Sequence, residues 1–251
     1  MYIDTHCHIS KDDYDDIDLV IKEDIQNNVD KIIISGYSTN TIKESLEIID
    51  KYKNIYATIG YHPSEADIYT DEDLILLERQ IQNKKVVGIG KIGLDYHYGK
   101  ENRDKQISLF RKQLSIADKY KLPVVIHSRD AVEDTINILK EYPEVIGDMH
   151  CFSGSIETAK TYISMGYKFG IGGVVTFKNS NLYKVVEEVG LSNILLETDA
   201  PYLTPEPFRG KINSSKYIPY IADKISNILN VSIEEVAKIT SNNANILFDL
   251  K

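Results

Sequence analysis

The sequence predicts a single-domain α/β protein with a (β/α)8 TIM-barrel fold across residues 1–251. Eight short runs rich in β-branched residues alternate with amphipathic segments of helical period. Side chains with metal-binding chemistry follow most of these runs, as catalytic groups do at the carboxyl ends of barrel strands. No segment resembles an interdomain linker. A doubly wound open sheet is the alternative fold that the same alternation allows.

The expected strands are short, as buried parallel strands are. They cover residues 2–4, 31–35, 55–60, 86–89, 122–126, 145–149, 167–170 and 193–196. The expected helices lie between them, where apolar residues recur every three or four positions. They cover residues 16–27, 41–51, 71–82, 103–119, 130–140, 155–165, 181–189, 215–230 and 232–248. We expect the last two helices to close the ring.

The composition indicates a folded enzyme-sized chain, with 42% hydrophobic and 27% charged residues. A net charge of −9 argues against a protein that coats nucleic acid with a broad basic face, although a local phosphate site remains possible. Cys7 and Cys151 belong to no CxxC pair, so we expect packed thiols, with metal ligation as the lesser alternative. No run is long enough to span a bilayer and no signal-peptide core is present, so we expect a cytoplasmic protein with no membrane partner.

The chain has six histidines, and most of them end an apolar run. His6 and His8 alternate at the end of the first run, so both imidazoles point to the same face of a strand end. Further groups with ligand chemistry follow later runs: His62, Lys91, His127, His150 and Asp199. In a barrel all of these positions meet at the carboxyl mouth. The pattern therefore predicts a site for a divalent metal.

The motifs resemble those of the TatD family of metal-dependent deoxyribonucleases, a branch of the amidohydrolase-like barrels. The matching segments span nearly the whole chain: DTHCH at 4–8, GYHP at 60–63, GLDYH at 93–97, IHSRDA at 126–131, HCFSG at 150–154, ETDAPYL at 197–203 and RGKIN at 209–213. The resemblance implies one or two metal ions and hydrolysis of DNA phosphodiesters, often from the 3′ end. It places the metal ligands at His6, His8, His127, His150 and Asp199. Imidazole and carboxylate ligands suit zinc, manganese or nickel, whereas magnesium prefers more oxygen ligands.

Lys91 departs from the family pattern, because GKIGLDY stands where the family has GEIGLDY and a glutamate that bridges two metals. A lysine ammonium beside metal ions is unfavourable. Three interpretations are open. In the first, Lys91 carries a carbamate that restores an anionic bridge. In the second, the site holds one metal, Lys91 is neutral or turned away, and activity is reduced or redirected. In the third, the lysine was introduced to disable the enzyme.

Other residues are expected around this centre. His62 either assists catalysis at the substrate phosphate or caps the following turn, SEAD. Tyr96 and Arg129 are candidate substrate contacts, although an ion pair is an equal alternative for Arg129. Arg209 and Lys211 follow the stiff segment PYLTPEPFRG and are expected to meet a phosphate backbone.

The predicted reaction is attack of metal-activated water on phosphorus, with Asp199 accepting the proton of the water. The expected partner of a monomeric enzyme is DNA, single-stranded or at its 3′ ends. Metal-activated water would also hydrolyse an amide, a lactone or a phosphotriester, so a small-molecule hydrolase is the alternative. Lys91 also leaves open a catalytically impaired relative.

Overall fold

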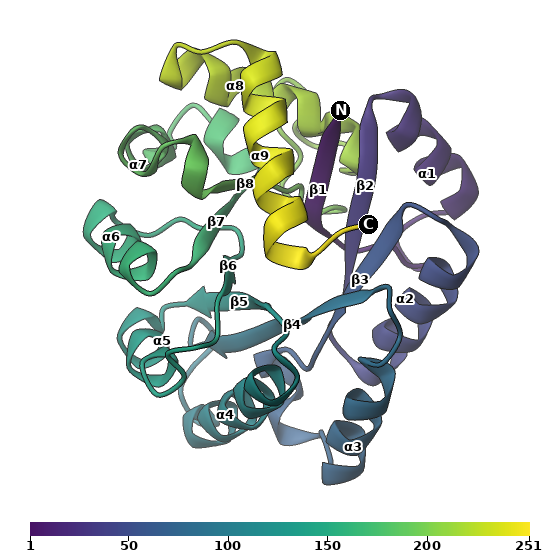
Figure 1. The fold of residues 1–251 in the computed structure, drawn as a ribbon, viewed down its shortest axis with the longest axis vertical. Coiled ribbons are helices and arrows are strands. Elements are labelled where there is room, and N and C mark those ends of the chain that lie inside the picture. The colour runs from purple at the N-terminus through teal and green to yellow at the C-terminus, as the bar shows by residue number, and fades with distance from the viewer.

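The eight expected strands all form in the computed structural model, which describes residues 1–251 and confirms the TIM barrel. They make one parallel sheet in the order β1-β2-β3-β4-β5-β6-β7-β8, with helices around it (Figure 1). The two ends of the sheet meet through backbone hydrogen bonds. Asp199 N donates to His6 O at 2.9 Å, and His8 N donates to Ala200 O at 2.7 Å. This closure excludes the doubly wound open sheet.

The strands are β1 (Tyr2–Cys7), β2 (Val29–Gly36), β3 (Ile55–Ile59), β4 (Val86–Asp95), β5 (Val124–Arg129), β6 (Gly147–Met149), β7 (Lys168–Ile171) and β8 (Ile194–Leu196). The α-helices are α1 (Ile17–Gln26), α2 (Thr39–Lys51), α3 (Asp71–Gln80), α4 (Arg103–Tyr120), α5 (Val132–Leu139), α6 (Ile156–Ser164), α7 (Leu182–Val189), α8 (Ile218–Leu229) and α9 (Ile233–Phe248). Short 3-10 turns are η1 (Pro63–Asp67), η2 (Gly173–Thr176), η3 (Leu191–Asn193) and η4 (Ser215–Tyr217).

Strands β4 and β5 run further toward the mouth than the sequence predicts. Both continue through polar residues, because the ladder joins backbone groups and does not depend on apolar side chains. Lys91 and His127 therefore lie within strands and not after them. Gly93 pairs with His127, and a Cβ at Gly93 would lie 2.0 Å from His127 O. Only glycine permits this close approach at a φ of +138°.

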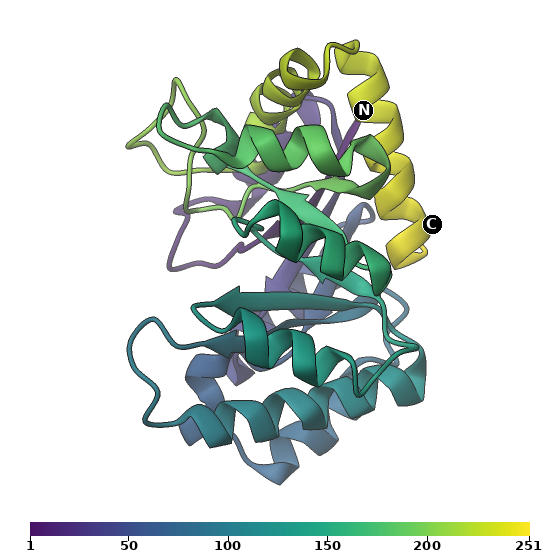
Figure 2. The same cartoon turned by 90° about the vertical axis from the view of Figure 1, so that its left-hand side faces the viewer.

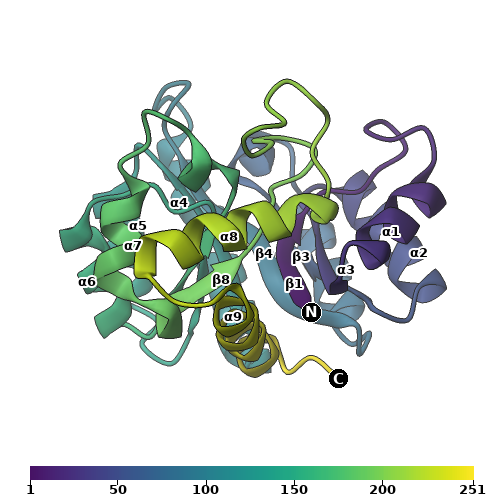
Figure 3. The ribbon, with the colours of Figure 1, turned by 90° about the horizontal axis from the view of Figure 1, so that it is seen from above.

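One end of the barrel is sealed by α9. In Figure 2 both termini and α9 lie at one end of the strands, whereas long loops project from the other, and Figure 3 shows the same division from above. The seal is an apolar cluster of residues from six strands and the end of the chain: Ile3, Ile33, Tyr56, Val87, Val125, Leu195, Ala244, Leu247, Phe248 and Leu250. Polar side chains further along the same strands consequently face the open mouth.

Five of the helices begin at side-chain caps that supply acceptors for free backbone N–H groups. Ser38 and Thr70 form capping boxes at α2 and α3, and Asp16, Ser155 and Ser232 cap α1, α6 and α9. No helix combines the length and the apolar surface that crossing a bilayer requires.

Candidate metal centre

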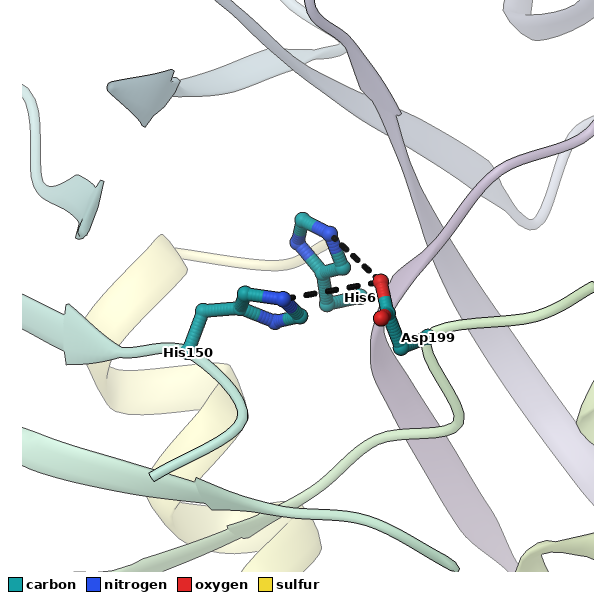
Figure 4. Close-up of side chains that lie close together, drawn as sticks. All are labelled: His6, His150 and Asp199. Carbon is teal, nitrogen blue, oxygen red and sulfur yellow. Dashed lines mark ion pairs between the residues drawn. The ribbon is translucent and has the colours of Figure 1, made fainter. Parts of the chain in front are cut away.

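A single carboxylate oxygen, Asp199 Oδ1, lies at the centre of the barrel mouth. Four side-chain nitrogens surround it: His8 Nε2 at 3.4 Å, His150 Nε2 at 3.5 Å, and His6 Nε2 and Lys91 Nζ at 3.6 Å each. Figure 4 shows His6 and His150 directed at Asp199 from different segments of the barrel. We call His6, His8, Lys91, His150 and Asp199 the Asp199 cluster. Each of these residues is less than one-tenth exposed.

The closure of the barrel brings this cluster together. Its two backbone hydrogen bonds join the histidine pair of β1 to the turn that carries Asp199, where φ is +51°. Asp4 also stabilises this junction between β1 and the turn that carries Asp199. Its carboxylate accepts hydrogen bonds from Thr198 N at 3.1 Å, from Thr198 Oγ1 at 2.6 Å and from Ser215 Oγ at 2.6 Å. Burial raises the pKa of Asp4 to about 6 in spite of these hydrogen bonds.

The tautomers of two histidines follow from their outer partners. His8 Nδ1 lies 3.0 Å from Ser35 O, and a carbonyl only accepts, so Nδ1 carries the proton. His150 Nδ1 lies 3.1 Å from Glu197 Oε2. When Nδ1 donates to the Glu197 carboxylate, the Nε2 lone pairs of both rings face Asp199 Oδ1. Hydrogen-bonded outer partners of this kind are typical of metal-bound histidines.

His8 Nε2, His150 Nε2 and Asp199 Oδ1 face one another, and such an arrangement of lone pairs needs a cation between them. Asp199 Oδ1 and both ring nitrogens of His6 are buried without a hydrogen-bond partner, which is costly unless an ion binds them. Burial, reinforced by neighbouring positive charge, lowers the pKa of His6 and of His150 well below the usual range. Both imidazoles are therefore neutral, as metal ligation requires. The residues present fit a divalent metal ion.

Lys91 extends into the cluster and does not turn away from it. Burial alone would raise the pKa of Asp199, but the nearby Lys91 ammonium outweighs burial and holds that pKa well below its usual range. Asp199 is thus ionised. The ammonium lies beside the same carboxylate that a metal ion would bind. A one-metal site in which the Lys91 side chain is turned away is therefore excluded.

His127 belongs to a second, neighbouring cluster with His62 and Asp95. Its Nε2 lies 2.9 Å from Asp95 Oδ2, and its ring centroid lies 4.7 Å from that of His62. One ligand atom from each of the three residues lies within 4.8 Å of the others. The ring of His150 is 6.5 Å from that of His127. The five-residue ligand set expected from the sequence is thus divided between two adjacent groups, which we call the Asp199 cluster and the His127 cluster.

His62 caps the turn that follows it, which was one of the two roles expected from the sequence. Its Nδ1 accepts a hydrogen bond from Ser64 N at 3.2 Å at the start of η1. Burial, with the neighbouring His127, lowers the pKa of His62 to about 2, so the ring is neutral. Capping through Nδ1 leaves Nε2 free, and the cap is compatible with a catalytic role.

Cys7 has the packed environment that the sequence predicts, whereas Cys151 is partly exposed and lines a cavity that reaches His150. Cys7 is fully buried, and burial raises the pKa of its thiol and that of Cys151 well above the usual value. Cys151 also lies in a group with His150 and Glu197 in which ligand atoms are within 4.8 Å of one another. Glu197 uses both oxygens on its neighbours, accepting from Cys151 N at 2.7 Å as well as from His150. Glu197 therefore fixes both the His150 ring and the backbone of the following residue.

The predicted substrate contacts differ in where they lie. Tyr96 is buried, and its hydroxyl donates to Asp134 Oδ2 at 2.7 Å, which does not favour the expected contact with substrate. Arg129 is exposed, lies 5.6 Å from the ring centroid of Tyr98, and lines a 420 Å³ cavity that reaches His150. This arrangement is compatible with a substrate contact.

Arg209 and Lys211 lie on the loop that follows Asp199. The Arg209 guanidinium stacks 4.0 Å from the ring centroid of Phe177, and its Nη1 donates to Thr204 O at 3.3 Å. Lys211 is exposed, with Nζ 5.3 Å from the ring of Phe208. Arg209 is held by Phe177 after η2 and by its own loop, Lys211 lies near Phe208 of the same loop, and the predicted contact of both with phosphate stays a prediction.

Comparison with known proteins agrees with this geometry. The family model described as TatD related DNase matches residues 3–249. The chain belongs to this family. It is 43% identical over 252 residues to the uncharacterized metal-dependent hydrolase YabD of Bacillus subtilis, with 99% of both chains covered. The present member of the TatD-related DNase family is therefore a metal-dependent hydrolase.

Solved structures of TatD-related proteins share the whole barrel with this chain. The crystal structure of YjjV, a TatD homologue from Escherichia coli K12, has a TM-score of 0.92 at 30% identity and covers 100% of this chain and 98% of its own. A TatD family hydrolase from Entamoeba histolytica has a TM-score of 0.87 at 26% identity, with the same coverage.

Sequence reasoning missed two residues of this TatD-related site. Asp4 stands within the motif DTHCH, and an acid in a buried strand was the available signal. Tyr37 follows β2 as other site residues follow their strands, and its ring centroid lies 5.2 Å from that of His8. Tyr37 is not a typical metal ligand, so the pattern of ligand-type residues in the sequence does not identify it.

Proposed function

We propose that this protein is a metal-dependent phosphodiesterase that removes nucleotides from DNA, acting as a monomer on single strands or 3′ ends. The observation that carries the proposal is the convergence of imidazole nitrogens on the ionised Asp199 carboxylate at the open end of the barrel. Membership of the TatD-related DNase family supports a phosphodiester substrate.

His6, His8, His150 and Asp199 would hold one divalent ion, and His127 would help to hold a second. Zinc, manganese or nickel suits these ligands better than magnesium does. Such an ion polarises a phosphoryl oxygen and makes water a stronger nucleophile.

The chain's own residues supply the remaining chemistry. Asp199 is ionised and can accept the proton that the attacking water releases. Neutral His62 can hydrogen-bond the leaving oxygen through its free Nε2. Arg129, at the edge of the cavity that reaches His150, can neutralise charge on the non-bridging oxygens. Arg209 and Lys211 would contact the strand further out.

Lys91 favours a centre that binds one metal ion and not two. Its ammonium stands against Asp199 where the family has an anionic bridge, so it repels a second ion. The same positive charge can instead attract a substrate phosphate. A carbamate on Lys91 would reverse the first effect, and only in that case would added bicarbonate raise metal loading.

The test is hydrolysis of a 5′-labelled single-stranded oligonucleotide with manganese, zinc, nickel or magnesium. We expect stepwise shortening that is lost in Asp199→Asn. In Arg209→Ala shortening should be weakened, with metal content unchanged. Turnover of lactones, acylated amines or phosphotriesters, without shortening of DNA under any of these metals, would support the small-molecule hydrolase instead. Metal binding without turnover of any of these substrates would support an impaired relative.

A further inference from the structure

We propose that the cleft beside His8 is a subsite for one terminal nucleoside, whose base stacks on Tyr202. The inference rests on the proposed function, because it assigns a place to the nucleoside next to the scissile phosphate. Apart from His8, no residue of the two ligand clusters lines this cleft.

The cleft opens directly from the Asp199 cluster. Its volume is 430 Å³, and His8 lines its inner end while the loop of residues 9–13 and the first turns of α2 form its walls. His8 Nε2 is 3.4 Å from Asp199 Oδ1. A group bound in the cleft is therefore adjacent to whatever binds at the metal centre. A cavity of this size is within the range that holds a small ligand such as a nucleoside.

Two tyrosines flank His8 at the cleft. The ring centroid of Tyr37 lies 5.2 Å from that of His8, and the ring of Tyr202 lies 6.4 Å from it. Tyr202 is 57% exposed and lines the cleft, so its ring is accessible to a ligand bound there. Bases of any identity stack on such rings, and polar groups of the lining, including Ser10 and Asn40, can bond a base or a sugar hydroxyl.

The charge of the lining limits which groups of a DNA strand the cleft can hold beside the nucleoside. Four acids and two lysines line the cleft: Asp12, Asp13, Glu44, Glu47, Lys11 and Lys43. Their formal sum is negative, so the cleft favours a neutral base and sugar and disfavours another phosphate. A DNA strand that continued through the cleft would meet this repulsion. The cleft is therefore suited to the end of a strand, which favours release of single nucleotides over internal cleavage.

Two variants and one matched control test the subsite by turnover. The substrates are a single-stranded oligonucleotide and bis(4-nitrophenyl) phosphate, a diester that has no nucleoside. Tyr202→Ala should raise KM for the oligonucleotide about tenfold more than KM for the small diester, as expected for loss of one stacking contact. Tyr202→Phe keeps the ring and should restore the wild-type ratio. Tyr183→Ala removes a 39% exposed tyrosine on α7 and should leave both values unchanged.

A second pair of substrates tests whether the negative charge of the cleft excludes a phosphate. A 3′-phosphorylated oligonucleotide should be cut at least tenfold more slowly than the same oligonucleotide with a 3′ hydroxyl. Equal KM ratios in wild type and Tyr202→Ala, or equal rates on the two 3′ ends, would overturn the subsite.

Calorimetric binding of deoxyadenosine 5′-monophosphate separates this inference from the proposed function, because binding does not require turnover. We expect binding to wild type and Tyr202→Phe, and about tenfold weaker binding to Tyr202→Ala. Binding with this pattern in a protein that hydrolyses no DNA would retain the subsite and overturn only the proposed function. Hydrolysis of DNA together with identical binding by all three proteins would overturn only the subsite.

Discussion

Lys91 weakens the binding of a divalent ion at the Asp199 cluster, and removing its charge should strengthen that binding. Lys91 is 9% exposed and its Nζ lies 3.6 Å from Asp199 Oδ1. The ammonium and a metal ion therefore compete for one carboxylate. They also repel each other, because both are positive.

The structure sets the size of the effect. At this separation an ammonium and a carboxylate attract each other by about 4–5 kcal/mol, with an effective dielectric constant of about 20. Desolvation of the two charges offsets part of that gain, and we take about half to remain. A competitor worth ~2 kcal/mol weakens metal binding by about 30-fold. Lys91→Gln should tighten binding by that factor.

The assay is calorimetric titration with zinc or manganese, combined with elemental analysis of the purified proteins. Lys91→Gln removes the positive charge alone, so it is the control for Lys91→Glu, which also adds the anionic bridge of the family pattern. Lys91→Glu should bind a second equivalent of metal and hydrolyse DNA faster. Restored hydrolysis from an inactive wild type would support the interpretation that the lysine disables the site.

If Lys91 carries a carbamate, we expect the opposite effect of Lys91→Gln on metal affinity. Added bicarbonate would then raise metal loading in the wild type alone, and Lys91→Gln would bind metal more weakly because the bridge is lost. Equal affinity, stoichiometry and activity in all three proteins, with and without bicarbonate, would refute the reasoning that this position controls the centre.

Three further predictions concern stability. Chelation of divalent ions should lower the Tm by about 5–10 °C, because an ion bound only to the folded state at 100 times its Kd contributes about 2.7 kcal/mol; a Tm insensitive to both chelator and added zinc would contradict the metal centre. Asp4→Ala should lower the free energy of unfolding in urea by about 3 kcal/mol, because it leaves the buried donors of Thr198 and Ser215 without an acceptor; Asp4→Asn, which keeps one oxygen, should cost less. Burial raises the pKa of Asp24 from 3.8 to about 7, so the folded state retains this proton between about pH 4 and 7, and stability falls as pH rises through that window. Asp24→Asn stays neutral and keeps an acceptor for Lys216 N, so its Tm should exceed that of the wild type by several degrees at pH 8 and match it at pH 4; an equal Tm difference at both pH values would contradict this assignment.

Much of the fold was predictable because the information is local. A strand in a barrel needs a short β-branched run, and each such run here is followed by a segment of helical period. The ends of the elements were less accurate. Strands β4 and β5 extend through Lys91 and His127 because backbone pairing continues where the side chains become polar.

The sequence by itself determined which groups face the mouth. Alternation places His6 and His8 on one face of β1, and the order of strands carries His150 and Asp199 to the same end of the barrel. These assignments need only the side-chain period and the direction of each strand, and both are properties of neighbouring residues.

The tertiary structure alone decided which of those groups meet. His127 joins Asp95 and His62 and does not contact Asp199, Lys91 turns into the cluster, and the hydroxyl of Tyr96 bonds a helix and not the mouth. Each outcome depends on differences of a few ångströms between strands far apart in the chain. The strand register, its shift between Gly90 and Ile92 in β4, and the closure of β1 onto the turn after β8 set those distances. No local pattern encodes them, because they arise only when the whole ring packs together.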